Sequence, residues 1–255
     1  MPLLFIGHGS PMNAIEDNSF TRMLKGLGKT IPKPKAIMSV SAHWLTKGTY
    51  VCGVDKPKLI YDFYGFPEKL SQVKYPCGGS PKFAKEVMDL ANQNPLGWDE
   101  SWGLDHGTWS VMRHIYPNAD IPVFQLSIDY NNGLGYHFEI GKVLRELRNK
   151  GVLVIGSGNL VHNLIKMDFQ NLDGEPYDWA VQFDAYVKAR LENRNFKALI
   201  NYQQIGSAAN KAHPTNDHYL PMLYVLGMCD KNEPLEFIFE GYQGRSVSMR
   251  CFKVG

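Results

Sequence analysis

Cysteine is scarce in this sequence, and the cysteines it has are far apart. Only four occur among 255 residues, and no two of them form a CxxC pair. A zinc ribbon and a dense disulfide framework both require closely spaced cysteines, so the sequence favours neither. We therefore expect a reducing, cytoplasmic location.

An excess of charge of one sign and a long apolar run are also missing. Lysine and arginine number 27 and aspartate and glutamate 25, giving a formal charge of +2 without a basic stripe that could neutralise several phosphates. The apolar start at residues 1–6 has no basic residues before it and ends at Gly7, too early for a signal peptide or a membrane span. We expect neither nucleic acid nor a membrane as a partner.

The order of apolar segments predicts the fold class. Short runs rich in β-branched residues predict buried strands at residues 3–6, 36–41, 123–127 and 152–155. Segments with helical spacing separate them, which favours a single α/β domain over residues 1–255, with a central, mainly parallel sheet and helices on both faces. Residues 235–240 and 246–252 flank a glycine-containing turn and predict an antiparallel pair, so the sheet should be mixed.

Three of the predicted strands run into histidines. His8 follows the first strand, His43 the second, and His162 comes soon after residues 152–155. In open α/β sheets ligands bind beyond the carboxyl ends of the strands, so these imidazoles should face one cleft. A single such histidine would most simply be structural, but three together favour one divalent metal ion per chain.

Residues 212–221 contain candidates for a fourth ligand. His213 and His218 are five positions apart with Pro214 between them, so they need not share a helix face. Either one could bind the metal while the other supports it. Asp217 is the carboxylate that could orient a ligating imidazole or bind the metal itself.

His106 and an aromatic segment suggest the chemistry. His106 lies among glycines and tryptophans just before an apolar helical run, where it could transfer protons to or from a phenol, or simply cap the helix beside Asp105. Residues 61–67 hold four aromatics and a glycine, a composition typical of a binding loop for a flat aromatic substrate or of a loop pinned to the core. His114 and His137 lie inside helical patterns, and we interpret both as structural.

Six segments together resemble a known family. They are GHGSPM at 7–12, SVSAHW at 39–44, DFYGFP at 62–67, WGLDHG at 102–107, GSGNLVHNL at 156–164 and HPTNDHYLP at 213–221. In this order and spacing they resemble the DODA-type class III extradiol aromatic ring-opening dioxygenases, which include bacterial and plant 4,5-DOPA dioxygenases. The resemblance spans nearly the whole chain.

The resemblance implies a non-haem, metal-dependent enzyme that opens the ring of a catechol such as DOPA with O2. His106 falls on the family's proposed acid–base histidine, and its metal-binding histidines correspond to His8, His43, His162 and His218. Fe(II) is implied for turnover, although histidine ligands also suit Zn(II) in the isolated protein. We expect the substrate to contact Trp44, Tyr64, Phe66 and His213.

Two other functions compete with ring opening. A Gly-His-Gly-Ser segment after the first strand also occurs in tetrapyrrole chelatases, so a chelatase-like protein or a zinc-dependent hydrolase is one alternative. The sequence lacks a clear general-base glutamate beside the predicted ligands, and this disfavours a hydrolase. A non-catalytic protein that binds a metal or an aromatic ligand is the other alternative.

Overall fold

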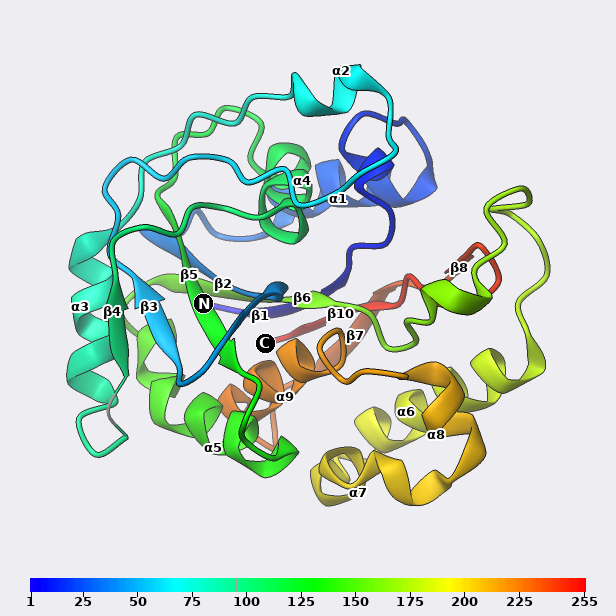
Figure 1. Cartoon of the computed structure of the whole chain (residues 1–255). Helices are drawn as coiled ribbons and strands as arrows, with labels where there is room; N and C mark the ends of the chain where they lie inside the picture. The colour runs from blue at the N-terminus through cyan, green and yellow to red at the C-terminus, as the bar shows by residue number, and fades with distance from the viewer. Residues whose placement is uncertain (95) are drawn as a thin grey trace.

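An eight-stranded sheet runs through the centre of the molecule in the computed structural model, which describes residues 1–94 and 96–255 (Figure 1). The strand order is β4-β3-β5-β2-β6-β1-β10-β7. The strands are β1 (Leu3–Gly7), β2 (Ala36–Thr46), β3 (Tyr50–Cys52), β4 (Gly97–Asp99), β5 (Val123–Asp129), β6 (Val152–Gly158), β7 (Leu235–Phe239) and β10 (Cys251–Val254).

The predicted mixed, mainly parallel sheet is confirmed. Strands β5, β2, β6 and β1 are parallel neighbours at its centre, and β10 and β7 continue it in antiparallel pairing. All four predicted buried strands exist, and each continues beyond its predicted end. Strand β2 continues to Thr46 and β6 to Gly158, so His43 lies within a strand instead of after one.

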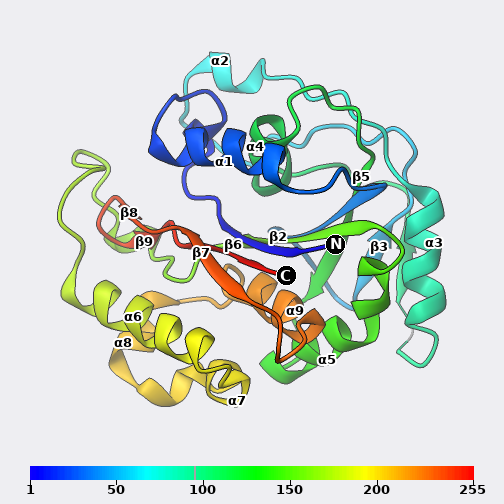
Figure 2. The same ribbon diagram turned by 180° about the vertical axis from the view of Figure 1, so that it is seen from behind.

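Helices cover both faces of the sheet, as the alternation of segments predicted. Figure 2 shows α1 (Ser19–Thr30) and α4 (His106–Ile115) on one face and α5 (Leu134–Leu144) and α9 (Leu220–Met228) on the other. The remaining helices are α2 (Glu68–Ser71), α3 (Pro81–Leu90), α6 (Asp178–Glu192), α7 (Phe196–Ile200) and α8 (Ser207–Ala212), with short 3₁₀ turns η1 (Pro11–Ala14), η2 (Arg145–Arg148), η3 (Leu164–Lys166) and η4 (Tyr202–Ile205). Among the described residues, no helix is both long and apolar enough to cross a membrane.

Each central strand buries side chains on both faces, which explains its continuous apolar sequence. In β1, Leu3 and Phe5 pack into the core on the α5 and α9 side, whereas Leu4 and Ile6 pack into the core beneath α1 and α4. Successive side chains of a strand point to opposite faces, so a strand covered on both sides is apolar at most positions. The buried polar residues inside these strands make hydrogen bonds, as Ser39 does with Thr108 and Gln125 with Asp105, and the histidines lie toward the carboxyl ends of the strands.

The C-terminal antiparallel pair is confirmed, but its limits differ from the prediction. Strand β7 pairs with β10, whereas a separate small hairpin is formed by β8 (Tyr242–Gln243) and β9 (Val247–Ser248). Gly244 and Arg245 both adopt positive φ angles, 54° and 67°. This left-handed turn reverses the chain within a few residues and places Val247 at the edge of the cavity described below.

Candidate active site

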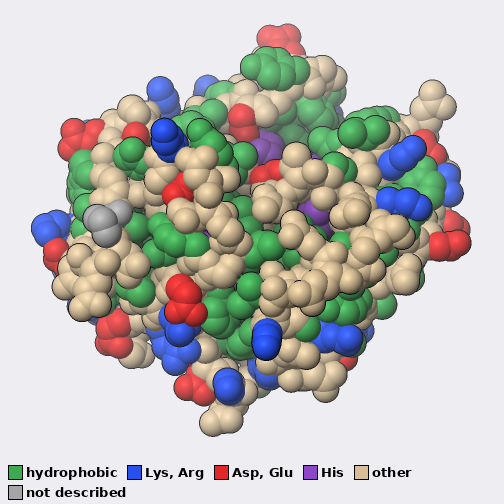
Figure 3. All heavy atoms as spheres, turned by 60° about the horizontal axis from the view of Figure 1, so that its bottom comes forward, with side chains coloured by type: hydrophobic (Ala, Val, Ile, Leu, Met, Phe, Trp, Pro, Cys, Tyr) green, Lys and Arg blue, Asp and Glu red, His purple; other side chains and the backbone are tan. Residues whose placement is uncertain are grey.

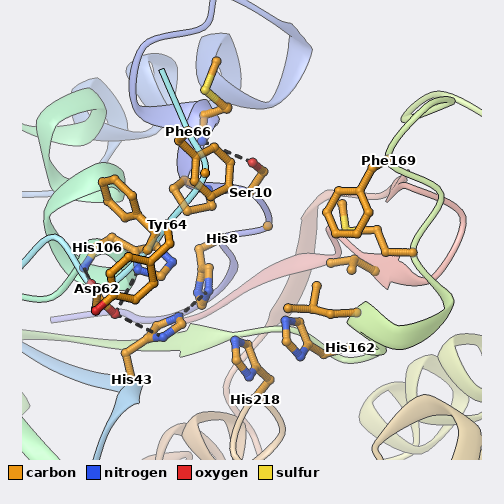
Figure 4. Close-up of a pocket in the computed structure, with 18 of the residues that line it drawn as sticks. His8, Ser10, His43, Asp62, Tyr64, Phe66, His106, His162, Phe169 and His218 are labelled. Atoms are coloured by element: carbon orange, nitrogen blue, oxygen red, sulfur yellow. Dashed lines mark hydrogen bonds and ion pairs between the residues drawn. The ribbon is translucent and has the colours of Figure 1, made fainter. Parts of the chain in front are cut away.

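The carboxyl ends of β1, β2 and β6 open into a cavity of about 530 Å³ (Figure 4). Its lining includes all four predicted metal ligands and the predicted acid–base residue, which are His8, His43, His162, His218 and His106. Figure 3 shows histidine side chains in a hollow of the surface, with hydrophobic side chains gathered at its edge. Segments that lie up to 210 residues apart, from His8 to His218, are thus brought to one place.

Three of these histidines form one compact group. The Nε2 atoms of His8 and His43 lie 3.1 Å apart, and His218 offers a ring nitrogen within 4.8 Å of a nitrogen of each of the other two. His8 follows β1, His43 belongs to β2, and His218 lies in the loop before α9. The carboxyl ends of β1 and β2, which flank β6, therefore bring two of these side chains together, and a loop adds the third.

The second ring nitrogen of each of the three histidines faces an oxygen. Ser157 donates its hydroxyl proton to the Gly107 carbonyl at 2.6 Å, so its oxygen accepts from His8 Nδ1 at 3.0 Å. His43 Nδ1 lies 3.3 Å from Asp62 Oδ2, and His218 Nδ1 contacts a carboxylate oxygen of Asp217. For His8 the hydrogen bonds of Ser157 place the proton on Nδ1 and the lone pair on Nε2. The neighbouring carboxylates favour the same form of His43 and His218, which is the arrangement that outer partners impose on metal-binding histidines.

This donor set fits a divalent metal ion. Two Nε2 lone pairs at 3.1 Å repel each other unless a cation lies between them, and imidazole nitrogens about 2.0–2.1 Å from one metal would stand about this far apart. Burial, followed by the neighbouring histidines, holds the pKa of His8 and of His43 well below its usual value. A proton shared between the two Nε2 atoms is therefore disfavoured. Both rings stay neutral, which is the form that binds a metal.

His162 takes a different position from the other three predicted ligands. Its ring stacks on that of His218, with 3.4 Å between the centroids and 6° between the planes. It groups with Asp217 and His218, and not with His8 and His43. Direct binding of His162 to the metal therefore stays a prediction. The contact that is observed joins the face of its ring to the face of the His218 ring.

A close approach between β6 and the His218 loop depends on Gly158. A Cβ atom at this position would lie 2.1 Å from the His218 carbonyl oxygen, to which Asn159 N also donates at 2.9 Å. We expect Gly158→Ala to displace His218 and weaken metal binding by roughly 10–100-fold, the usual cost of disturbing a ligand's support. Competition with a chelator of known affinity measures the change.

Gly26→Ala is the matched control for this prediction. Gly26 lies in α1, and a Cβ atom there would meet nothing within 4 Å. Metal affinity should be unchanged, and the free energy of unfolding should rise by about 0.5–1 kcal/mol because glycine weakens helix interiors. Equal metal affinities in the two variants would contradict the role of Gly158.

His106 and Asp62 form a second cluster beside the first. Asp62 Oδ2 lies 3.0 Å from His106 Nδ1, and Asp62 Oδ1 accepts from the His106 backbone N at 3.0 Å. The same Oδ2 is the oxygen near His43, whose ring centroid lies 4.0 Å from that of His106. Burial raises the pKa of Asp62, but the His106 contacts outweigh it and keep the pKa below its usual value. Asp62 is therefore an anion between two imidazoles.

Two histidines and one carboxylate are also a recognised iron-binding set, so His43, Asp62 and His106 are a second candidate group. In this group the Asp62 carboxylate lies 3.3 Å from His43 Nδ1 and 3.0 Å from His106 Nδ1 and so attracts both rings, although neither Asp62 Oδ2 nor His106 Nδ1 makes a hydrogen bond with a described residue. The 3.1 Å approach of the His8 and His43 Nε2 atoms favours the three-histidine group as the metal site.

A buried polar network fixes the start of α4 and hence His106. Asp105 caps the helix by accepting from Thr108 N at 3.1 Å, and it also accepts from Ser41 Oγ and Gln125 Nε2, each at 2.7 Å. Burial, then the Asp62 charge, raises the pKa of Asp105 to about 6. Asp105 is therefore the cap, and His106 is the first helical residue, with its side chain in the cavity.

Two apolar walls complete the cavity. One comes from the aromatic segment and comprises Phe63, Tyr64 and Phe66. The other comes from the loop after β6 and comprises Leu164, Met167, Phe169 and Leu172. Met12 and Val247 also contribute. Two of the predicted substrate contacts, Tyr64 and Phe66, thus line the cavity.

The other two predicted substrate contacts, Trp44 and His213, lie outside the cavity lining. Because β2 continues past His43, Trp44 points to the opposite face, where it is 3 % exposed and stacks on Trp102 at 5.2 Å. His213 follows α8 and is buried against Tyr219, with its Nε2 bonded to the Leu160 carbonyl at 2.8 Å. Burial lowers the pKa of His213 to about 4.

Comparison with known proteins identifies the family. Residues 2–249 match the model of the catalytic LigB subunit of aromatic ring-opening dioxygenase. The chain belongs to this family. The LigB-type chain is 46% identical to a 4,5-DOPA dioxygenase extradiol of Escherichia coli K12, a match that covers 100% of this chain and 95% of that protein. It is 35% identical to a Beta vulgaris protein of the same name, over 98% of this chain and 94% of that one.

The solved structures agree with this placement. A crystal structure of an uncharacterized protein from Escherichia coli K12 superposes with a TM-score of 0.86 at 42% identity, covering 100% of both chains. The LigB-type protein is accordingly an extradiol ring-cleaving dioxygenase with the α/β fold of its family. Membership in an enzyme family also disfavours the purely ligand-binding alternative.

Proposed function

We propose that this LigB-family protein opens the ring of a catechol such as DOPA with O2, using one metal ion held by His8, His43 and His218. The observation that carries the proposal is the convergence of three Nε2 lone pairs beside His106 and Asp62. The names of the related 4,5-DOPA dioxygenases support the substrate class.

The donor set supports a metal with free coordination positions. A bound Fe(II) would supply sites for both catechol oxygens and for dioxygen, and Zn(II) could occupy the same histidines without turnover. Three neutral histidines leave such positions open. His162 is the residue that would become a fourth ligand, and its stacking on His218 keeps it within reach of the same cluster.

His106 is the residue we assign to proton transfer. Its Nδ1 faces Asp62, which leaves Nε2 as the nitrogen free to exchange a proton with a substrate hydroxyl. The Asp62 carboxylate orients the ring and stabilises the positive charge that His106 gains when it takes a proton. Phe63 packs edge-on against His106 at 5.7 Å, so the exchange takes place beside an apolar surface.

The hydrolase alternative has less support. Among the residues that the structure describes, no glutamate lines the cavity, and the one aspartate that does, Asp62, already contacts His43 and His106. An activated water would lack a carboxylate base of its own. The cavity lining therefore disfavours a hydrolase more strongly than the sequence alone does.

Metal exchange followed by turnover tests the proposal. Protein stripped of metal with a chelator and reloaded anaerobically with Fe(II) should, when oxygen and a catechol are added, consume one O2 per catechol and form a yellow ring-opened product. Zinc-loaded protein is the control and should be inactive. Failure of every catechol to react on protein shown to contain stoichiometric Fe(II) would count against the proposal.

A further inference from the structure

We propose that Arg245, in the turn between β8 and β9, is a positioning residue for the part of the cavity that binds the ring substituent. It acts through the apolar wall formed after β6, which comprises Leu164, Met167, Phe169 and Leu172. The inference rests on the proposed catechol-opening function and names a residue that controls how tightly a substituted catechol is bound.

The backbone of the turn holds the wall in place. Gly244 N donates to the Leu172 carbonyl at 2.7 Å, and the Gly244 carbonyl accepts from Asp168 N at 3.0 Å. Phe169 lies between these two bonds in the sequence, so the loop closes over the turn (Figure 1). A Cβ atom on Gly244 would lie only 2.5 Å from Met167 Cγ. The turn is therefore in direct contact with the wall.

The side chain of Arg245 joins the start of this loop to its end. Its Nε donates to the Glu175 carbonyl at 2.8 Å, and its guanidinium carbon lies 4.3 Å from the centroid of the Tyr177 ring. A guanidinium nitrogen also lies 3.8 Å from Asp168 Oδ2. That ion pair is partly exposed and contributes little, so the contacts with Glu175 and Tyr177 are the main ones.

The backbone conformation of Arg245 separates the role of its side chain from that of the turn. Its φ angle of 67° lies in the left-handed region, which glycine adopts without strain and L side chains rarely adopt. Such residues persist where their surroundings hold them. The backbone alone would favour glycine here, and the contacts of the arginine side chain with the loop offset that preference.

The wall faces the place that a ring substituent would occupy. Figure 4 places Phe169 across the cavity from Tyr64 and Phe66, with the histidines below and between them. A catechol bound through its two hydroxyls at the histidines directs a substituent, such as the amino-acid side chain of DOPA, away from them and between these walls. Arg245 is not among the described residues that line the cavity, so it acts on the substrate only through the wall.

Arg245→Gly tests the inference because it removes the side chain and suits the turn backbone. Calorimetry on zinc-loaded protein without oxygen should show DOPA binding about three- to tenfold more weakly, since wall side chains must then be ordered on binding. Catechol affinity should stay within about twofold, because catechol has no substituent to contact the wall. In the Fe(II)-loaded protein the KM for DOPA should rise while kcat is retained.

Arg194→Gly is the matched control. Arg194 also has a left-handed backbone, with φ of 53°, and its guanidinium donates to the Glu233 carbonyl, outside the cavity lining. The ratio of DOPA affinity to catechol affinity should not change in this variant. An equal change of the ratio in both variants would overturn the inference, as would a parallel loss of both affinities in Arg245→Gly, which indicates a general structural role.

Tyr177→Leu approaches the same contact from the loop. It removes the ring on which the guanidinium lies and should lower the affinity ratio in the same direction, even if Arg245→Gly fails to fold. In the double variant the two effects should add to less than their sum, because both changes remove one shared contact. An unchanged ratio in Tyr177→Leu would contradict the inference. Failure of the Fe(II)-loaded protein to open any catechol would instead contradict the proposed function, while the affinity ratios still decide the role of Arg245.

Discussion

His8→Ala protein is expected to lose both its metal and its ring-opening activity. His8 provides one of three converging Nε2 lone pairs, and its own Nδ1 is fixed by Ser157. Loss of an outer contact of this kind weakens metal binding by roughly 10–100-fold, so loss of the ligand itself should cost more. Metal content after dialysis against a metal buffer, together with oxygen uptake on catechol, measures both effects.

His114→Ala is the matched control for the loss of His8. His114 is also a buried histidine, but it lies on α4 outside the cavity, with Nε2 bonded to the Asn13 carbonyl at 2.8 Å. Its removal should lower the free energy of unfolding by about 1–3 kcal/mol because the carbonyl loses its buried partner, and metal content should be retained. Stoichiometric metal in the His8 variant would refute the three-histidine centre.

His106→Ala should differ from His8→Ala in keeping its metal while still losing turnover. His106 contacts Asp62 and does not belong to the group formed by His8, His43 and His218. Loss of a positioned acid–base group lowers kcat by about 10²–10⁴-fold, whereas metal content and catechol affinity should change little. Single-turnover oxygen uptake and anaerobic binding of catechol measure these quantities independently.

The contrary result for His106 would also be informative. If His106→Ala releases the metal, the ion is held by His43, Asp62 and His106, the second group of ligands that the cavity offers. His8→Ala would then keep its metal. The two variants therefore have opposite outcomes under the two possible centres, and comparing them assigns the ligands.

Much of the fold was predictable because the central strands are buried on both faces. The apolar runs at residues 3–6 and 152–155 are fully buried, and their sequence carries that signal directly. Strands β3 and β4 have only three residues each, too few for any periodicity to be detected. The limits of β9 and β10 depended on a left-handed turn at Gly244 and Arg245, which local pattern did not reveal.

The site was predictable only in part, because some of its residues lie at strand ends and others lie in loops. Histidines at strand ends follow from the topology of the sheet, so their arrival at one cavity could be expected. A strand that ends at residue 41, as the apolar run predicts, would leave Trp44 in a loop beside His43, whereas β2 continues to Thr46 and Trp44 lies outside the cavity lining. The carboxylate of Asp62 and the wall at residues 164–172 belong to loops, whose positions are determined by tertiary contacts and not by periodicity.

The place of Asp62 in the aromatic segment affects how this enzyme could acquire new substrates. Asp62 supports a predicted ligand and the predicted acid–base residue, while Tyr64, only two positions later, is 93 % exposed on the cavity wall. Replacement of the whole aromatic segment at residues 61–67 would remove Asp62, which supports His43 and His106, together with the side chains that face the substrate. The enzyme would then lose its activity along with its original substrate preference. Diversification is therefore confined to single positions such as Tyr64, which can vary freely beside a residue that cannot.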